Sequence, residues 1–487
     1  MSTVPENRIR PGNSGPPNPQ GEYVLYWMTA FRRLAWNYAL QHAADLSREL
    51  GKPLVILEAL RVDYPFASPR LHRFMLQGMA ERARALEGMD PVHFPYVERR
   101  KGEGKGILQA LAQRACCVVV DDFPSFFLPR MVEAAGRAVD VRMERVDSNG
   151  LLPLGVPDKE FSAAYHFRRY LQKVLPDHLP ESPDPDPLGK ALPRARGVIP
   201  QEILERWPRA REDLLGGEAG ALAELPLDHS VHPTGLPGTR EEGRRLLNRF
   251  LGDGLGRYHE DRNHPDLPAT SGLSPFLHFG LISPHEIFSG VAEWEGWTPL
   301  RLSPRTDGKR TGWWGMGAGA EAFLDQLVTW RELGFNMSFR REDYTEYSSL
   351  PQWARETLAE HEADPRPHLY TLEEFRRAET HDPLWNAAQR QLLQEGVIHN
   401  YLRMLWGKKI LEWSPSPRDA VGVMLELNDS LALDGRDPNS YSGIFWCLGR
   451  YDRGWPERPV FGKVRSMSSE ATRRKVRLDK YMDRFSS

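Results

Sequence analysis

The sequence predicts an α/β domain with a doubly wound parallel sheet, followed by an all-α domain. Apolar, β-rich segments alternate with amphipathic helical segments up to about residue 150, as in parallel sheets covered by helices. After residue 239 the apolar residues recur with helical spacing. Residues 176–240 are rich in Pro, Asp, Gly and Glu, which is typical of a connector on the surface. A chain of 487 residues is expected to form two or three domains.

The first domain is predicted to span residues 21–175. Buried strands are expected at residues 23–28, 53–59, 91–94 and 115–120, with helices at residues 33–50, 68–87 and 104–114. The first strand is not followed by a G-x-G-x-x-G sequence, so an ordinary dinucleotide site is not expected there. Residues 1–20 are rich in Pro, Gly and Asn and have no apolar core, which predicts a disordered leader and not a signal peptide.

The second domain is predicted to span residues 241–487 and to be helical. Its expected helices are residues 241–251, 283–294, 320–336, 353–361, 372–378, 383–396, 400–413 and 417–427. Residues 295–319 have no clear period and contain several Gly, Trp and Arg residues, which predicts a basic loop.

Composition excludes some classes of protein and leaves others open. The chain has no apolar run long enough to cross a bilayer, and its three cysteines form no disulfide framework, so a cytoplasmic protein is expected. No Cys/His spacing suggests a metal site. From Arg450 to the end there are 11 Lys or Arg against 5 Asp or Glu. That basic end could meet nucleic acid, or it could be a solvated helix face.

Hydroxyl groups and a glycine form a candidate phosphate cradle after Tyr258. The stretch is Thr270-Ser271-Gly272-Leu273-Ser274, and it precedes a predicted helix turn. Hydroxyls and backbone N–H groups at the mouth of a helix attract anions. The alternative is a Ser/Thr cap without a ligand.

A polar run from Asp434 to Ser442 ends on the aromatic residues Phe445 and Trp446. The Asp, Gly, Pro and Asn residues of this run usually form a simple turn. Here, however, tryptophans alternate with polar residues both before and after the run. Arg403 and Asp434 could form a buried ion pair, and such pairs are costly unless further hydrogen bonds compensate. An arginine beside a flavin would stabilise negative charge on the reduced ring. The sequence therefore suggests a redox cofactor site, with a structural ion pair as the alternative.

Three tryptophans lie on two neighbouring predicted helices. Trp406 and Trp413 are seven residues apart and share a helix face about 10 Å apart along the axis, and Trp385 precedes them by one helix. Oxidisable rings in succession could carry an electron to a flavin. The alternative is that all three are core residues.

Taken together, these motifs resemble the photolyase and cryptochrome flavoproteins, and within them the class II cyclobutane pyrimidine dimer photolyases. The matching stretches are residues 271–280, 330–333, 370–375, 380–386, 407–414 and 434–439. Residues 26–28 and the helix from Arg33 match the N-terminal antenna domain of the family more loosely. The resemblance covers nearly everything after residue 20.

The resemblance implies a Rossmann-like α/β antenna domain, a linker and an all-helical FAD domain. It also implies a monomeric protein that acts on double-stranded DNA containing a pyrimidine dimer. Excited reduced FAD would pass an electron to the flipped-out dimer, and an antenna chromophore (deazaflavin or another) could bind in the first domain. FAD contacts are implied for Tyr258, Thr270, Ser271, Gly272, Leu273, Ser274, Trp385, Asn400, Arg403, Asn428, Asp434 and Asp437. Asn428 would face the reactive ring nitrogen, and Trp385, Trp406 and Trp413 would form the photoreduction chain. Trp330, Met404 and Trp446 would line the lesion pocket, and Arg453 would grip the DNA backbone.

Two positions depart from the family's pattern. Gln326 stands where the family usually has a glutamate that hydrogen-bonds the dimer, and a glutamine can neither carry the charge nor deliver a proton. Leu405 stands where relatives often have an aromatic residue. Gln326 leaves two alternatives open: a photolyase with altered lesion preference, or a cryptochrome-like photoreceptor that does not repair DNA.

Overall fold

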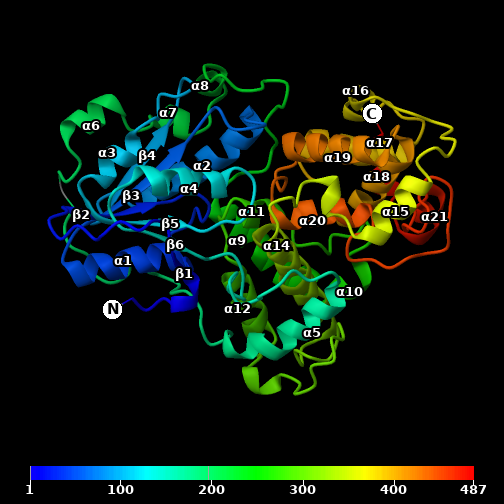
Figure 1. Ribbon diagram of the computed structural model, residues 1–487, viewed down its shortest axis with the longest axis horizontal. Helices are drawn as coiled ribbons and strands as arrows, with labels where there is room; N and C mark the ends of the chain where they lie inside the picture. The colour runs from blue at the N-terminus through cyan, green and yellow to red at the C-terminus, as the bar shows by residue number, and fades with distance from the viewer. Residues whose placement is uncertain (1, 196, 487) are drawn as a thin grey trace. The chain divides into compact units, whose positions relative to one another are not determined.

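The structure of the protein is a computed structural model that describes residues 2–195 and 197–486 (Figure 1). The chain forms two compact units. The first contains Met1–Val156, Asp177–Arg245 and Leu273–Gly290, and the second contains Pro157–Pro176, Leu246–Gly272 and Val291–Ser487. These units are not the continuous ranges expected from the sequence, and most of the expected linker, residues 176–240, belongs to the first unit.

The first unit is built on a six-stranded sheet, which confirms the predicted α/β class. The strands are β1 (Ile9–Pro11), β2 (Tyr23–Trp27), β3 (Leu54–Leu60), β4 (Val92–Val97), β5 (Ala115–Asp121) and β6 (Met143–Val146). Their order is β1-β6-β5-β2-β3-β4, and all neighbours are parallel except the β1–β6 pair. Strands buried on both faces need continuous apolar sequences, which is why β2 to β5 could be predicted.

The leader expected to be disordered is instead folded against the sheet, so that prediction is wrong. Ile9 pairs with Val146 and Pro11 with Glu144 in an antiparallel edge ladder. The side chain of Arg8 is fully buried and donates to the carbonyl oxygen of Leu151 over 2.8 Å. Composition suggested disorder, but the backbone groups of this segment find partners about 130 residues away, which no local pattern reveals.

Helices cover both faces of the sheet. They are α1 (Tyr38–Leu50), α2 (Pro69–Ala85), α3 (Ile107–Ala112) and α4 (Leu128–Ala138). Figure 1 shows α1 on one side of the sheet and α3 on the other. Helix α1 begins five residues later than expected, because Asn37 caps it and Asp121 holds the preceding loop by accepting the backbone N–H groups of residues 29–31.

The described residues of the expected linker include the short helices α6 (Gln201–Arg206), α7 (Glu212–Leu215) and α8 (Ala219–Ala223). Ile203 and Trp207 from this segment join the core on the side of the sheet that faces α3 and α4. The segment is therefore an integral part of the first unit.

The second half of the chain is helical, as predicted. Its helices are α9 (Arg240–Arg249), α10 (Tyr258–Asp261), α11 (Ser274–His278), α12 (Pro284–Trp294), α13 (Ala318–Leu324), α14 (Arg331–Arg340), α15 (Gln352–Glu360), α16 (Leu372–Arg376), α17 (Pro383–Glu395), α18 (Asn400–Trp413), α19 (Pro417–Leu431), α20 (Pro438–Cys447), α21 (Ser469–Lys475) and α22 (Asp479–Arg484). Helix α5 (Ala164–Val174) was not expected, although it belongs to the same unit.

Two departures from the predicted helices position the candidate site. The helix expected at residues 320–336 is interrupted by a π-helical stretch, Asp325–Trp330, between α13 and α14. Stretches of this kind occur frequently at functional sites. The polar run after Asp434 is a turn only up to Arg436, after which Pro438 begins α20. Gly334 lets α14 approach α20 closely, because a Cβ atom there would lie 2.8 Å from the backbone of Asn439.

Candidate functional site

Three buried tryptophans form a contiguous aromatic cluster between α17 and α18. The rings of Trp385 and Trp406 are parallel, with centroids 6.5 Å apart and planes 5° apart. Trp413 contacts the same Trp385 ring at a steep angle, with centroids 6.1 Å apart. Trp385 therefore lies between the other two, although it precedes both in sequence. Three rings in contact could pass an electron in succession.

The aromatic cluster continues beyond Trp413 toward the surface. The ring of Tyr370, which is partly exposed, lies 5.7 Å from Trp413, and that of the exposed His381 lies 4.9 Å away. The Tyr370 hydroxyl also hydrogen-bonds His381 Nδ1 over 2.6 Å. We did not single out either side chain as a site residue from the sequence, although both lie in stretches quoted for the family resemblance.

The predicted ion pair between Arg403 and Asp434 is present. Arg403 Nη2 donates to Asp434 Oδ1 over 2.6 Å. The side chains keep 23% and 14% of their exposure, so the pair is half-buried and not fully enclosed as expected. Both charged groups therefore remain accessible at the surface of the second unit.

Next to this pair, a buried hydrogen-bond network fixes the side chain of Asn428. Its amide nitrogen donates to Asp429 Oδ1 over 2.8 Å, and its amide oxygen accepts the Ser440 hydroxyl over 3.0 Å. Burial raises the pKa of Asp429, against the opposing effect of Arg436 and the hydrogen bonds that the carboxylate accepts. Asn428 is thus held in one orientation by residues of α19 and α20.

Arg436 is the structural centre of the turn before α20, and sequence reasoning missed it. It is 2% exposed, and its backbone has a φ of 63°, in the left-handed region. Its backbone N–H donates to Asp429 Oδ1 and its guanidinium donates to the carbonyl oxygens of Asp429 and Ala432. The Asp-Gly-Arg-Asp sequence therefore combines one accessible acid, Asp434, with a buried arginine that closes the turn.

The residues predicted to hold phosphates and ribose are divided between the two units. Tyr258 is buried and packs edge-on against Phe250 and Phe323. Gly272 has a φ of 70°, which favours glycine. Leu273 and Ser274 belong to the first unit, whereas Thr270 and Ser271 belong to the second.

Arg262 was not predicted, but its guanidinium lies 5.6 Å from the Tyr258 ring. Its Nη1 is buried without a hydrogen-bond partner among the described residues. An unpaired buried donor of this kind suits a phosphate oxygen.

The other predicted cofactor residues occupy helix starts. Asn400 is exposed at the first position of α18, and Asp437 caps α20 by accepting the backbone N–H of Asn439 over 2.9 Å.

The residues predicted to meet the lesion lie on three helical segments of the second unit and are partly exposed. Gln326 and Trp330 come from the π-helical stretch, Met404 from α18 and Trp446 from α20. Arg453 is exposed and lies 5.5 Å from the ring of Trp455.

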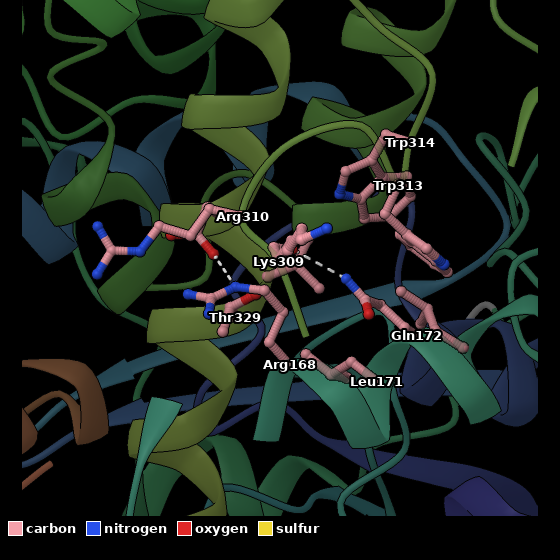
Figure 2. A pocket seen from close by; sticks show the side chains of 11 residues that line it. Arg168, Leu171, Gln172, Lys309, Arg310, Trp313, Trp314 and Thr329 are labelled. Carbon is pink, nitrogen blue, oxygen red and sulfur yellow. Dashed lines mark hydrogen bonds and ion pairs between the residues drawn. The ribbon is translucent and has the colours of Figure 1, made fainter. Parts of the chain in front are cut away.

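The predicted basic loop, residues 295–319, forms a pocket against α5 and the π-helical stretch. Figure 2 shows Arg168 and Gln172 extending from α5 toward the loop, and their side chains donate to the carbonyl oxygens of Gly308 and Lys309. Arg168 also donates to Asp325 Oδ1 over 2.7 Å. The pocket encloses about 310 Å³, counting the space at its mouth. Asp325, Val328 and Thr329 of the π-helical stretch line the pocket, so the loop and α5 both contact the stretch that carries Gln326 and Trp330.

Neither a metal-binding cluster nor a membrane-spanning helix is present in the described part of the chain. Within it, no group of three or more His, Cys, Asp or Glu side chains could hold a metal ion. No helix formed by residues 2–195 and 197–486 is long and apolar enough to cross a membrane.

Solved structures with the same fold are photolyases. The class III photolyase of Agrobacterium tumefaciens matches with a TM-score of 0.64 and 18% identity, over 96% of this chain and 86% of that one. An archaeal photolyase from Sulfolobus tokodaii, solved with two FAD molecules, matches with a TM-score of 0.64 and 15% identity, over 95% of this chain and 89% of that one. At these identities the likeness establishes the fold class. No protein-family model matches the chain.

Curated relatives extend the likeness to the sequence. The deoxyribodipyrimidine photo-lyase of Methanothermobacter thermautotrophicus is 34% identical, over 98% of both chains. That of Oryza sativa subsp. japonica is 34% identical over 97% of this chain and 88% of its own, and that of Potorous tridactylus is 33% identical over 94% and 80%. The chain therefore belongs to the deoxyribodipyrimidine photo-lyase family. This membership confirms the predicted enzyme class and FAD as its cofactor.

Proposed function

We propose that this protein uses light to repair cyclobutane pyrimidine dimers in DNA, in the manner of a class II photolyase. The observation that carries the proposal is the contact of Trp385 with both Trp406 and Trp413, which provides a chain of oxidisable rings. Similarity to deoxyribodipyrimidine photo-lyases along nearly the whole chain supports it. The class and the lesion are inferred from the residues of the candidate site.

The ring system of FAD would be held by Arg403, Asp434 and Asn428. Their arrangement fits the group, because the half-buried ion pair leaves both charges accessible and the Asn428 amide has a fixed orientation. Arg262, with its unpaired buried Nη1, suits a phosphate of the dinucleotide. When bound and reduced, FAD supplies the excited electron that splits the dimer, while the protein binds and orients the reactants.

The dimer would be flipped out of the duplex into a pocket lined by Trp330, Met404 and Trp446. Damaged bases stack and pair poorly, which lowers the cost of flipping, and aromatic walls bind the exposed bases. Gln326 would hydrogen-bond the dimer with a neutral amide that both donates and accepts. The exposed Arg453 and the basic C-terminal segment would bind phosphates of the DNA backbone.

The decisive experiment is illumination of the reduced protein with DNA that contains thymine dimers. We expect thymine to be regenerated in the light and not in the dark, at a rate proportional to the amount of reduced flavin. If the flavin is intact and no thymine appears, the repair function is wrong.

Gln326 gives the proposal a second test. A protein with altered lesion preference would repair another pyrimidine photoproduct faster than the cyclobutane dimer, and a cryptochrome-like photoreceptor would repair neither. We expect Gln326→Glu to repair thymine dimers at least as well as the parent, because the carboxylate can accept stronger hydrogen bonds. A loss of repair in this variant would mean that the amide itself is required.

A further inference from the structure

Lys408 on α18 is fully buried and has no carboxylate partner among the residues that the structure describes. Its exposed fraction is 0%, and its ammonium group donates one hydrogen bond, to the carbonyl oxygen of Cys447 over 2.7 Å. Within the described residues it makes no ion pair. Lysines are almost never fully buried unless they are paired, because burial of a charge is costly. The position of this lysine therefore needs an explanation other than stability.

The second partner of Lys408 is the aromatic ring of Trp446. Gly407 lets α18 approach α20 closely, because a Cβ atom there would lie 2.6 Å from Cys447 Sγ. This close approach places Lys408 Nζ 5.0 Å from the centroid of the Trp446 ring. The guanidinium of Arg465 lies 5.8 Å from the same ring. Two cations therefore flank the one tryptophan that α20 contributes to the proposed lesion pocket.

The groups around Lys408 decide the pH range in which it is charged. Its pKa is lowered to about 8, mainly by burial, and Arg465 acts in the same direction whereas the Asp452 carboxylate acts in the opposite one. Burial also raises the pKa of the Cys447 thiol to about 11, so this neighbour is neutral near pH 8. The ammonium charge is thus present at neutral pH and is lost in mildly basic solution.

We propose that Lys408 is a positioning residue for the lesion site, which acts through Trp446 by holding a positive charge against the ring that lines the dimer pocket. The inference rests on the proposed function, because Trp446 must line that pocket. A dimer that has accepted an electron is an anion, and a fixed cation in a site shielded from water stabilises it more than the neutral dimer. The electron returns once the ring is split, so Lys408 neither gains nor loses a proton in the cycle.

The first test needs no flavin, DNA or light-driven reaction. The near-ultraviolet absorbance of Trp446, isolated by subtracting the spectrum of Trp446→Phe, is followed from pH 6.5 to 9.5. We expect a titration with a midpoint near pH 8 that is lost in Lys408→Met. The matched control is Lys409→Met, because Lys409 is the next residue of α18 but pairs with Glu412 and lies over Trp413. A Trp446 spectrum that does not change with pH in the parent protein overturns the inference.

The second test measures repair by the pre-reduced holoenzyme. We expect the yield per absorbed photon to fall about three- to tenfold as pH rises through the pKa of Lys408, as for the loss of one desolvated cation–π contact. Lys408→Met should show the low yield at every pH, and Lys408→Arg should keep the high yield without the pH dependence.

The outcomes separate this inference from the proposed function. If the parent protein repairs no dimers at any pH, the proposed function fails even if Trp446 titrates. If Lys408→Met repairs dimers with the yield and pH profile of the parent, the role of Lys408 fails and the repair function stands. If Lys408→Met does not fold, the inference is still tested by the parent protein, because a Trp446 spectrum that does not change with pH overturns it.

Discussion

Trp385 donates its indole N–H to the carbonyl oxygen of Trp406 over 3.0 Å, and the two rings lie parallel. The hydrogen bond fixes the ring of Trp385 against α18, and the centroid of the Trp413 ring lies 6.1 Å from that of Trp385. Trp385 is thus the middle member of the aromatic chain, and both ends depend on it.

Removal of Trp385 or of Trp406 should block light-driven reduction of oxidised FAD. We expect Trp406→Phe and Trp385→Phe each to slow photoreduction more than tenfold, because phenylalanine is harder to oxidise but similar in shape. Repair by enzyme reduced beforehand with dithionite should remain largely intact. The measurement is the loss of flavin absorbance under blue light with an external thiol. Trp207→Phe, a core change in the first unit, is the control, and an unchanged rate in Trp385→Phe would refute the chain.

Two arginines of the site should have opposite effects on stability and on flavin binding. Arg403→Gln removes a half-exposed ion pair, which is worth about 1 kcal/mol or less, yet it should release FAD during gel filtration. Arg436→Gln should cost about 1–3 kcal/mol of unfolding free energy, because the shorter side chain leaves the buried carbonyl oxygens of Asp429 and Ala432 without the donors that Arg436 provides. Urea unfolding of the apoproteins and flavin-to-protein ratios measure the two effects. An Arg436→Gln variant with the same unfolding free energy as the parent protein would show that the turn does not depend on Arg436.

Lys408 should destabilise the fold at neutral pH. Its pKa is about 8 in the folded state against 10.5 in the unfolded state, so the unfolded chain binds more protons between these values and stability rises with pH there. The full effect is on the order of 3 kcal/mol. We expect Lys408→Met to be more stable than the parent at pH 7 and to gain less between pH 8 and 10.5. Urea unfolding at pH 7 and pH 9.5 tests this, and a less stable variant at pH 7 would contradict it.

The buried pair of Arg168 and Asp325 should hold the π-helical stretch in place. Each side chain is 8% exposed, so Arg168→Met leaves a buried carboxylate unpaired and should cost about 3–5 kcal/mol. The double variant Arg168→Met/Asp325→Leu should recover most of that loss, because it removes both charges. Lys309→Met, an exposed change at the same pocket, is the control. A double variant as unstable as the single one would show that the pair does not act as a unit.

Local patterns were sufficient where one segment decides its own structure. Helix α18 has the predicted bounds, 400–413, and α17 ends within one residue of the prediction, because apolar spacing, Asp382 as a cap and Gly396 as a stop act within a few residues. Strands β2 to β5 followed from continuous apolar runs. By contrast, β1 depends on pairing with residues 144–146, and the leader was therefore misjudged.

Composition and periodicity predicted the α/β and helical halves, and the family resemblance of the motifs predicted a flavoprotein and a set of aromatic and charged residues for its site. They could not order the three tryptophans, because the packing of α17 on α18 places the earliest of them in the middle. Nor do they distinguish Lys408 from Lys409. The tertiary structure decides this, because α20 packs against one side of α18 and removes the ammonium group of Lys408 from water, while that of Lys409 pairs with Glu412. Burial is a property of two helices together, and no single segment encodes it.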